Sequence, residues 1–450
     1  MMGLYTRIAS GLLFPLHERL KRHDSVRRRR ALETSQWFGR DQLKSLQLDN
    51  FKSFVARLYR DNDYYRQVME DAGFGPDDIR DLQDLQRFPF LTKPLIRENV
   101  EALKSHNAGP LARFNTGGST GEPLVFYLGN ERVSHDVAAK WRATRWWSVD
   151  IGDPEIVIWG SPVELGAQDR VRAFRDRLLR SKLIPAFEMS AMNLDRFIAE
   201  IRAMRPRMLF GYPSSMALIA ERAEAQHVDM KGLGIKVCFV TSERLYDKQR
   251  ETIERVFAAP VANGYGGRDA GFIAHQCPHG GMHLSAEDIL VEIIGPDGQV
   301  LPPGEAGEVV VTHLATGEFP FVRYRTGDVA VLDDGQCSCG RGLPMLKEIQ
   351  GRTTDFIVAP DGTVMHGLAL IYILRDLPEV ALFKIIQEAG NRYRILVVPG
   401  DGYTDAHTAI IHSGLIKRLG EDAEVIIDLV DDIPRERSGK FRYVVNQVVG

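Results

Sequence analysis

The chain has 450 residues, a length that favours two or three domains over a single compact core. Its 57 Lys and Arg residues nearly balance its 60 Asp and Glu residues, and the formal net charge of −3 gives no indication of a nucleic-acid partner. Because no apolar run approaches the roughly 20 residues of a membrane span, no signal-peptide pattern opens the chain, and only 4 cysteines occur, we expect a cytoplasmic protein with neither a membrane span nor a disulfide scaffold.

The first 35 residues combine an apolar cluster with a basic run. Leu12, Leu13, Phe14 and Leu16 precede Lys21 and Arg22 and then four consecutive arginines at 27–30. This pattern fits a helix on a membrane surface, and it equally fits a helix packed on the body of the protein with a solvated basic end, which we favour. Residues 41–72 carry apolar residues at helical intervals and are predicted to form one core-facing helix that ends at Gly73.

A glycine- and hydroxyl-rich loop follows, between two stretches that read as strands. It consists of Thr116, Gly117, Gly118, Ser119, Thr120 and Gly121. Glycines let backbone N–H groups converge on an anion, and hydroxyls add donors, so the loop is a candidate phosphate cradle. It is not a Walker loop, because no lysine follows the last glycine, and residues 124–127 continue as a strand. Taken alone, the pattern fits a flexible hairpin turn as well.

Strands and helices then alternate. Short apolar runs at 155–159, 207–212 and 236–241 are separated by helical segments such as 191–204 and 214–226. This spacing predicts a parallel sheet with crossover helices on its faces, and ligands of such sheets bind at the carboxyl ends of the strands. Those ends carry residues 211–215, Ser242 and Glu243, and residues 263–269.

The rest of the chain is expected to form two further parts. Residues 289–332 are rich in strands, including 289–294 and 308–312, and suggest a smaller β subdomain. Beyond Gly351 the pattern is mixed. Its expected strands and helices are strands 355–358, 380–387, 391–398 and 423–430 and helices 367–375 and 404–419.

Cysteines and histidines recur in two short segments about fifty residues apart. The candidate ligands are Cys277, His283, Cys337 and Cys339, with His279 as a competing imidazole. Three thiolates and one imidazole suit a tetrahedral Zn²⁺, and four protein ligands leave no open position, so the role would be structural. The alternative is four unrelated reduced side chains. Cys238 lies in an apolar strand and is interpreted as a core residue.

Five motifs occur in the order found in adenylate-forming enzymes. They are the cradle, Tyr265-Gly266, Tyr324-Arg325-Thr326-Gly327-Asp328, Gly351-Arg352-Thr353-Thr354-Asp355 and Ser438-Gly439-Lys440. Over roughly residues 90–445 the chain resembles the phenylacetate–CoA ligase family, in particular its CapK-like branch associated with capsular polysaccharide genes. The resemblance implies an α/β fold with a large N-terminal domain (1–350) and a small, mobile C-terminal α+β lid (351–450), and a homodimer is the family expectation.

The resemblance also implies a reaction and its residues. A small carboxylic acid attacks the α-phosphate of ATP, giving an acyl-adenylate and pyrophosphate, and CoA then takes the acyl group. The roles implied for single residues are the cradle on the β- and γ-phosphates, Tyr265 and Gly266 at adenine, Asp328 at the ribose hydroxyls, Arg352 at ribose or phosphate, Lys440 at the α-phosphate and substrate carboxylate, and Asp269 with Mg²⁺. Ser242 and Glu243 are further cofactor-binding candidates, and residues 209–215 and 240–243 are expected to line part of the acyl pocket.

The chain departs from the family pattern at several positions. Glu122 stands where relatives usually place lysine, Asp269 replaces a glutamate, and Thr354 replaces a charged residue at the hinge. Residues 358–363 are shaped like a hairpin turn where CoA ligases carry a glycine-rich loop. The acceptor therefore stays open among CoA, an amine, a sugar hydroxyl and a carrier-protein thiol, and a catalytically silent, zinc-stabilised scaffold is the rival hypothesis.

Overall fold

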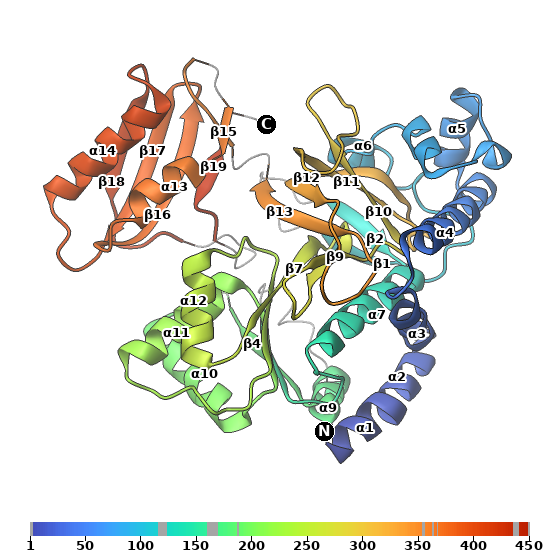
Figure 1. Cartoon of the computed structure of the whole chain (residues 1–450), viewed down its shortest axis with the longest axis horizontal. Coiled ribbons are helices and arrows are strands. Elements are labelled where there is room, and N and C mark those ends of the chain that lie inside the picture. Colours follow the sequence, from blue (N-terminus) through green and yellow to red (C-terminus); the bar gives the residue numbers. More distant parts are fainter. Residues whose placement is uncertain are drawn as a thin grey trace. The chain divides into compact units, whose positions relative to one another are not determined.

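The computed structural model of the chain describes residues 3–115, 124–159, 170–186, 189–352, 356–361, 364–366, 368–434 and 441–448. Contacts between residues divide the chain into two compact units. The first unit comprises Met1–Thr326 with Ala330–Ile349, and the second comprises Gly327–Val329 with Gln350–Gly450 (Figure 1). The chain thus has an α/β fold with a large mixed-sheet unit and a small C-terminal sheet unit.

Eleven strands of the described chain form one sheet in the order β10-β11-β12-β13-β9-β8-β7-β6-β5-β3-β4. Strands β4, β3, β5, β6 and β7 pair in parallel, whereas β7, β8 and β9 pair antiparallel, as do β9 with β13 and β10 with β11. The strands are β3 (Glu155–Trp159), β4 (Ser181–Pro185), β5 (Met208–Gly211), β6 (Val237–Thr241), β7 (Val261–Gly267), β8 (Gly271–Gln276), β9 (Met282–Leu284), β10 (Ile289–Ile294), β11 (Ala306–His313), β12 (Phe321–Asp333) and β13 (Met345–Arg352).

The strand-rich stretch at 289–332, interpreted from the sequence as a smaller β subdomain, forms one end of this large sheet. Strands β10, β11 and β12 lie in the same sheet as the parallel strands, joined to them through β13, β9 and β8. The strands predicted at 289–294 and 308–312 are present as β10 and β11. Period-2 patterns show that a segment is extended, but they do not show which neighbour it pairs with.

Helices cover both faces of the parallel strands. On one face, α10 (Ala191–Met204), α11 (Pro213–Ala225) and α12 (Asp247–Phe257) form a core with alternate strand residues such as Leu209 and Cys238. The intervening strand residues, including Phe210 and Phe239, face the opposite way and pack with Ala143 of α7 (Asn130–Trp146). The alternation of side chains along each strand thus builds two cores, one on each face.

The N-terminal region is helical. It comprises α1 (Leu4–Ile8), the π-helical segment η1 (Ala9–Leu13), α2 (Phe14–Leu20), α3 (Ser25–Ser35), α4 (Arg40–Asp61), α5 (Asp63–Asp71), the 3₁₀ segments η2 (Pro76–Asp78) and η3 (Leu82–Arg87), and α6 (Lys93–Glu98). The single helix expected at 41–72 is in fact two, because Asn62 leaves the helical conformation and its side chain caps α5 by accepting from the Tyr65 N–H. A short α9 (Arg170–Leu179) precedes β4.

Phe51 and Phe54 of α4 belong to a large core with Val309, Phe321 and Phe126. Phe126 lies on β2 (Val125–Leu128), which pairs antiparallel with β1 (Ala112–Asn115). The strands expected on both sides of the cradle are therefore present, and the cradle itself lies outside the described residues.

The second unit carries a four-stranded sheet in the order β18-β17-β16-β19 and a two-stranded hairpin, β14-β15. Its elements are β14 (Phe356–Val358), β15 (Val364–His366), α13 (Leu368–Arg375), β16 (Val380–Ala389), β17 (Arg392–Pro399), α14 (Asp405–Leu419), β18 (Glu424–Leu429) and β19 (Val444–Asn446). The antiparallel pairing of β14 with β15 confirms the hairpin expected around 358–363. Among the described residues, no helix is both long and apolar enough to cross a bilayer.

Candidate active site

The carboxyl ends of the central parallel strands lie level with one another. Gly211 at the end of β5 is paired with Ile158 of β3 and Val240 of β6, and Thr241 at the end of β6 is paired with Gly264 of β7. The segments that follow these ends therefore leave the same edge of the sheet. This edge is where open parallel sheets bind their ligands.

Glu243 and Ser242 follow β6 at this edge. The Glu243 carboxylate accepts the Ser214 N–H at 3.3 Å, in the first turn of α11, where a negative charge is favoured by the helix dipole. Ser242 has a φ of +70°, a left-handed conformation that non-glycine residues adopt rarely and that often marks functional sites. Both predicted residues are half-buried, so the edge is accessible at this point.

Tyr265 and Gly266 lie on β7, with an irregularity in the β7–β8 pairing between them. Tyr265 is 8% exposed, and its neighbours in the hydrophobic core include Ala274 and Ala286. A Cβ atom on Gly266 would come within 2.0 Å of the Gly271 carbonyl oxygen, so the close approach of the two strands requires glycine. The Tyr-Gly pair therefore has a structural reason in this fold, whatever it binds.

Asp269 lies in the turn between β7 and β8. Its Oδ2 accepts the hydroxyl of Tyr324 at 2.6 Å, and its Oδ1 accepts the Ala270 N–H at 3.1 Å. Tyr324 lies on β12 and is fully buried. The tyrosine of the Tyr-Arg-Thr-Gly-Asp motif thus orients the carboxylate of Asp269, a positioning role that the motif alone did not reveal.

Arg132 fastens the same turn from α7. Its guanidinium donates to the Asp269 carbonyl oxygen at 3.2 Å and to the Arg268 carbonyl oxygen at 3.3 Å. It also donates through Nε to both carboxylate oxygens of Asp136, each at 3.0 Å. Burial raises the pKa of Asp136, but the Arg132 and His135 side chains outweigh it and the net shift is downward, so Asp136 is ionised. No sequence signal singled out Arg132, because the turn that it holds is more than 130 residues away along the chain.

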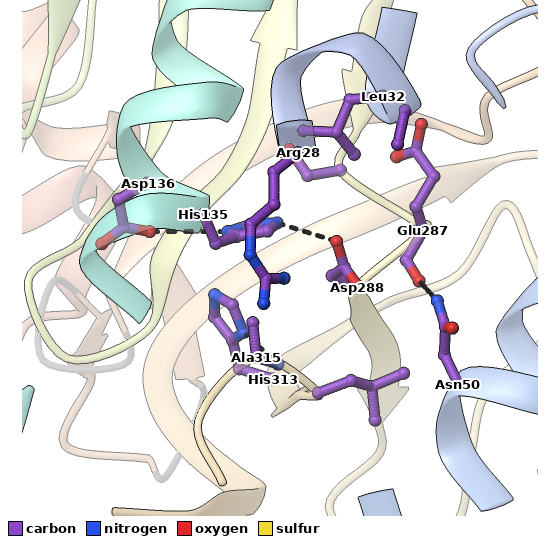
Figure 2. A network of polar contacts seen from close by, with 12 residues as sticks. Arg28, Leu32, Asn50, His135, Asp136, Glu287, Asp288, His313 and Ala315 are labelled. Carbon is purple, nitrogen blue, oxygen red and sulfur yellow. Dashed lines mark hydrogen bonds and ion pairs between the residues drawn. The ribbon is translucent and has the colours of Figure 1, made fainter. Parts of the chain in front are cut away.

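Two buried histidines, His135 and His313, lie side by side next to Asp136 (Figure 2). His135 lies between Asp136 and Asp288, with its Nε2 3.4 Å from Asp288 Oδ2, and its ring meets that of His313 edge to face. His313 Nδ1 accepts the Ala315 N–H at 3.3 Å, so the proton of the neutral ring is on Nε2. His135, Asp136 and His313 lie close enough to surround an ion. However, Nδ1 of His313 already accepts a hydrogen bond and Nε2 carries the proton, so His313 has no lone pair for a metal. We assign the group to the support of the turn.

Asp328 and Arg352 lie on neighbouring strands, β12 and β13. Asp328 is half-buried, and Gly327–Val329 and Gln350–Gly450 belong to the same compact unit. The hairpin of β12 and β13 therefore brings the Asp328 motif beside the Arg352 motif. The cradle residues Thr116, Gly117, Gly118, Ser119, Thr120 and Gly121, together with Lys440, lie outside the described residues.

The structure also brings Cys277, His283, Cys337 and Cys339 together. One ligand atom from each lies within 4.8 Å of all the others. Cys277 Sγ is 3.6 Å from Cys337 Sγ, and Cys339 Sγ is 3.2 Å from His283 Nε2. Two thiolates bound at 2.3 Å to a tetrahedral ion are about 3.8 Å apart, so the observed spacing fits a zinc site.

The polar surroundings of this group suit metal ligands as well. His283 Nδ1 lies 3.3 Å from the Leu343 carbonyl oxygen, so it donates there and leaves Nε2 facing the sulfur atoms. Burial lowers the pKa of His283 to about 4, so its ring is neutral. Burial raises the pKa of Cys277 to about 12, whereas for Cys339 hydrogen bonds from Arg341 and the neighbouring thiols outweigh burial and lower the pKa. His279, the competing imidazole, instead contacts Ser338 Oγ.

Comparison with known proteins yields consistent matches. A model of the CapK C-terminal domain matches residues 357–447. The protein CapK of Staphylococcus aureus is 23% identical over 417 residues, which covers 90% of each chain. The phenylacetate-coenzyme A ligase of Thermus thermophilus is 26% identical over 355 residues, 76% of this chain and 77% of that ligase.

Among solved structures, a 2-hydroxyisobutyryl-CoA ligase in its postadenylation state, in complex with an acyl-AMP, superposes with a TM-score of 0.73. It is 20% identical and covers 91% of this chain and 90% of its own. The fold is therefore that of the acyl-CoA ligases. Over most of its length the chain is thus similar to the protein CapK and to a phenylacetate-coenzyme A ligase, and its C-terminal part matches the CapK C-terminal domain.

Proposed function

We propose that this protein activates a small carboxylic acid with ATP and passes the acyl group to CoA. A carboxylate oxygen of the acid attacks the α-phosphorus of ATP, and the bond from that phosphorus to the bridging oxygen breaks to release pyrophosphate. The thiolate of CoA then attacks the acyl carbonyl carbon, and AMP leaves with the bonding electrons. The observation that carries the proposal is the common edge at which Glu243 follows β6 and Asp269 follows β7, with Tyr265 near the end of β7, in a chain whose relatives include phenylacetate–CoA ligases.

We assign adenine to the Tyr265-Gly266 segment, the ribose hydroxyls to Asp328, and ribose or phosphate to Arg352. The half-buried position of Asp328, and its place on a strand adjacent to the strand of Arg352, support this assignment. Ser242 and Glu243 would lie beside the acyl group.

The phosphates would be held by the cradle and by a metal ion beside Asp269. Oxygen ligands are those that Mg²⁺ prefers, and the Asp269 carboxylate, oriented by Tyr324, fits that preference. When bound, Mg²⁺ neutralises charge on the phosphates. Glu122 is acidic where relatives usually place lysine, so the loop itself supplies less positive charge. Lys440 and the backbone donors of residues 116–121 would therefore carry more of the neutralisation of the phosphates.

We assign residues 351–450 to a mobile lid that carries Lys440 to the α-phosphate and substrate carboxylate. A lid of this kind excludes water from the adenylate and lets one active site serve two half-reactions. A compact second unit that begins at Gln350 supports this assignment.

We further propose a structural zinc site at Cys277, His283, Cys337 and Cys339. The support is the donor set and its spacing, which suit a closed tetrahedral site. These side chains would hold the loop before β9 to the loop between β12 and β13, and the site would take no part in the reaction.

The proposed function is tested by carboxylate-dependent exchange of pyrophosphate into ATP, measured across aryl, fatty and amino acids. We expect exchange with one class of acid and its loss, by at least about a hundredfold, in the Lys440→Ala variant, because that cation acts on the charge that develops in the transition state. A Lys417→Ala variant on α14 is the matched control. If no acid supports exchange and ATP fails to raise the melting temperature, the scaffold hypothesis replaces the enzyme.

A second acceptor class competes with CoA. The β14–β15 hairpin stands where CoA ligases of this family carry a glycine-rich loop, and the match to CapK covers 90% of this chain. These observations favour an amine, a sugar hydroxyl or a carrier thiol, as in capsule or cell-envelope polysaccharide synthesis. Acyl-adenylate formed on the enzyme should be consumed on adding CoA; if it is stable with CoA and consumed by another nucleophile, the second acceptor is correct.

A further inference from the structure

The first helices of the chain form a continuous rod along the edge of the first unit, made of α1, η1 and α2 (Figure 1). Its inner face is anchored at three points along its length. Thr6 donates to the Asp153 carboxylate at 2.8 Å, Phe14 packs edge to face on Trp141, and Glu18 accepts the Ser25 hydroxyl at 2.6 Å. The rod is therefore part of the folded unit.

The outer face of the rod is apolar. Leu4, Ile8, Leu12, Leu16 and Leu20 recur every fourth residue and are 77%, 43%, 63%, 54% and 77% exposed. In an uninterrupted α-helix a spacing of four drifts steadily around the axis. The π-helical segment η1 turns through a smaller angle per residue than an α-helix and so reverses part of this drift. The five side chains therefore stay in one stripe. A stripe of this length facing solvent is unusual for a protein surface without a partner.

The surroundings of the stripe are basic. Between residues 3 and 30, exposed cations are Arg7, Arg19, Lys21, Arg22, Arg27 and Arg30. The two acidic residues of the same range turn inward or pair locally: Glu18 is buried, and Asp24 pairs with Arg27 and Arg28. The Tyr5 hydroxyl donates to the Leu178 carbonyl, which places a further exposed arginine, Arg177, close by.

We propose that this face binds the surface of a membrane that contains anionic lipids. The rod, about 25 Å long, would lie in the interface with its leucine stripe among the acyl chains and its cations at the headgroups. A second copy of the chain is a poorer occupant, because two such faces would bring like charges together. The chain as a whole is slightly acidic, so the attraction belongs to this face alone.

The proposal is tested by co-flotation of the full chain with vesicles of phosphatidylcholine, with and without phosphatidylglycerol, at two salt concentrations. We expect binding to vesicles with phosphatidylglycerol, weakened by salt. The double variant Leu12→Gln/Leu16→Gln should bind at least about tenfold more weakly, because each leucine loses its apolar contact with the acyl chains. Arg19→Gln/Lys21→Gln should bind several-fold more weakly, since each cation adds to the attraction.

The matched control is Ile410→Gln/Leu429→Gln, which replaces two similarly exposed apolar residues in the second unit, 49% and 52% exposed, and should bind like the wild type. Melting temperatures and light scattering accompany each variant. Absence of binding to anionic vesicles at low salt overturns the proposal, as does equal loss in the control. If instead the leucine variant converts an oligomer into a monomer while vesicle binding is unchanged, the stripe is a self-association surface.

Discussion

At the scale of single residues, the Asp269 carboxylate depends on side chains that come from far along the chain. Tyr324 donates to the carboxylate itself, and Arg132 donates to the backbone on both sides of it. Neither contact takes part in the adenylation that we propose, but both set where the carboxylate points. A carboxylate held by a buried hydroxyl keeps its position while a ligand enters and leaves.

We therefore expect Tyr324→Phe to lower the rate of ATP–pyrophosphate exchange about tenfold while the fold is retained. The variant removes one hydrogen bond to a charged group, worth about 1.5–3 kcal/mol, and leaves the ring in the core. Exchange rates at several Mg²⁺ concentrations measure the effect, and the Mg²⁺ requirement should rise. A purely structural role would lower the melting temperature and leave that requirement unchanged.

Tyr59→Phe is the control for this experiment. Tyr59 also donates to a carboxylate, that of Glu70 at 3.2 Å, but on the surface and away from the strand ends. Its exchange rate should equal that of the wild type, and equal losses in the two variants would contradict the positioning role of Tyr324.

At the scale of elements, two loops meet at the Cys/His group. Cys277 and His283 flank the turn from β8 into β9, and Cys337 and Cys339 lie between β12 and β13. The turn itself is tight: a Cβ atom on Gly281 would come within 2.6 Å of Cys337 Sγ. A shared ion would hold the two loops together through its bonds to the four ligands. Coordination would thus do what hydrophobic packing does elsewhere in the fold.

The purified protein should accordingly contain one Zn²⁺ per chain by elemental analysis, and a strong chelator should lower its melting temperature by on the order of 5 °C or more. Cys339→Ser should lose both the metal and the stabilisation. His279→Gln should keep both, because His279 contacts Ser338 outside the group. Full metal content in Cys339→Ser would refute the ligand set, and loss of metal in His279→Gln would exchange the two histidines.

At the scale of the whole molecule, the chain is two compact units, and the proposed reaction has two chemical steps. Of the residues proposed for the nucleotide, Asp328 and Arg352 belong to the second unit. Lys440 lies far along the second unit in sequence. If the lid brings Lys440 to the adenylation step, Lys440 is not required in the acyl-transfer step that follows.

The two half-reactions should therefore separate in the Lys440→Ala variant. Formation of the acyl-adenylate should fall by at least about a hundredfold, whereas transfer from a supplied acyl-adenylate to CoA should proceed within about threefold of the wild-type rate. Rapid-quench measurement of each half-reaction tests this. Equal losses in both steps would mean that Lys440 acts through the fold or through a single fixed arrangement of the lid.

Local patterns were sufficient for much of this fold and for part of the site. The runs at 155–159, 289–294 and 308–312 predicted strands that the structure has, and the strands on both sides of the cradle are present. The helix expected at 41–72 was wrong in one respect, because the side chain of Asn62 competes with the backbone and starts a new helix. The Cys/His spacing predicted a group that the structure does bring together. Ligands only a few residues apart in one short segment necessarily lie close to one another.

The sequence by itself determined the α/β class and the alternation of the central strands, because local periodicity shows both, and its ordered motifs indicated the similarity to CapK and to phenylacetate–CoA ligases. Only the tertiary structure decided that β10, β11 and β12 extend the same sheet, that Tyr324 and Arg132 hold the Asp269 turn, and that the leucine stripe of the first helices faces outward. The physical reason is that all three features depend on contacts between segments far apart in the sequence. Strand pairing, buried hydrogen bonds and the solvent-facing side of a helix cannot be deduced from the pattern of neighbouring residues alone.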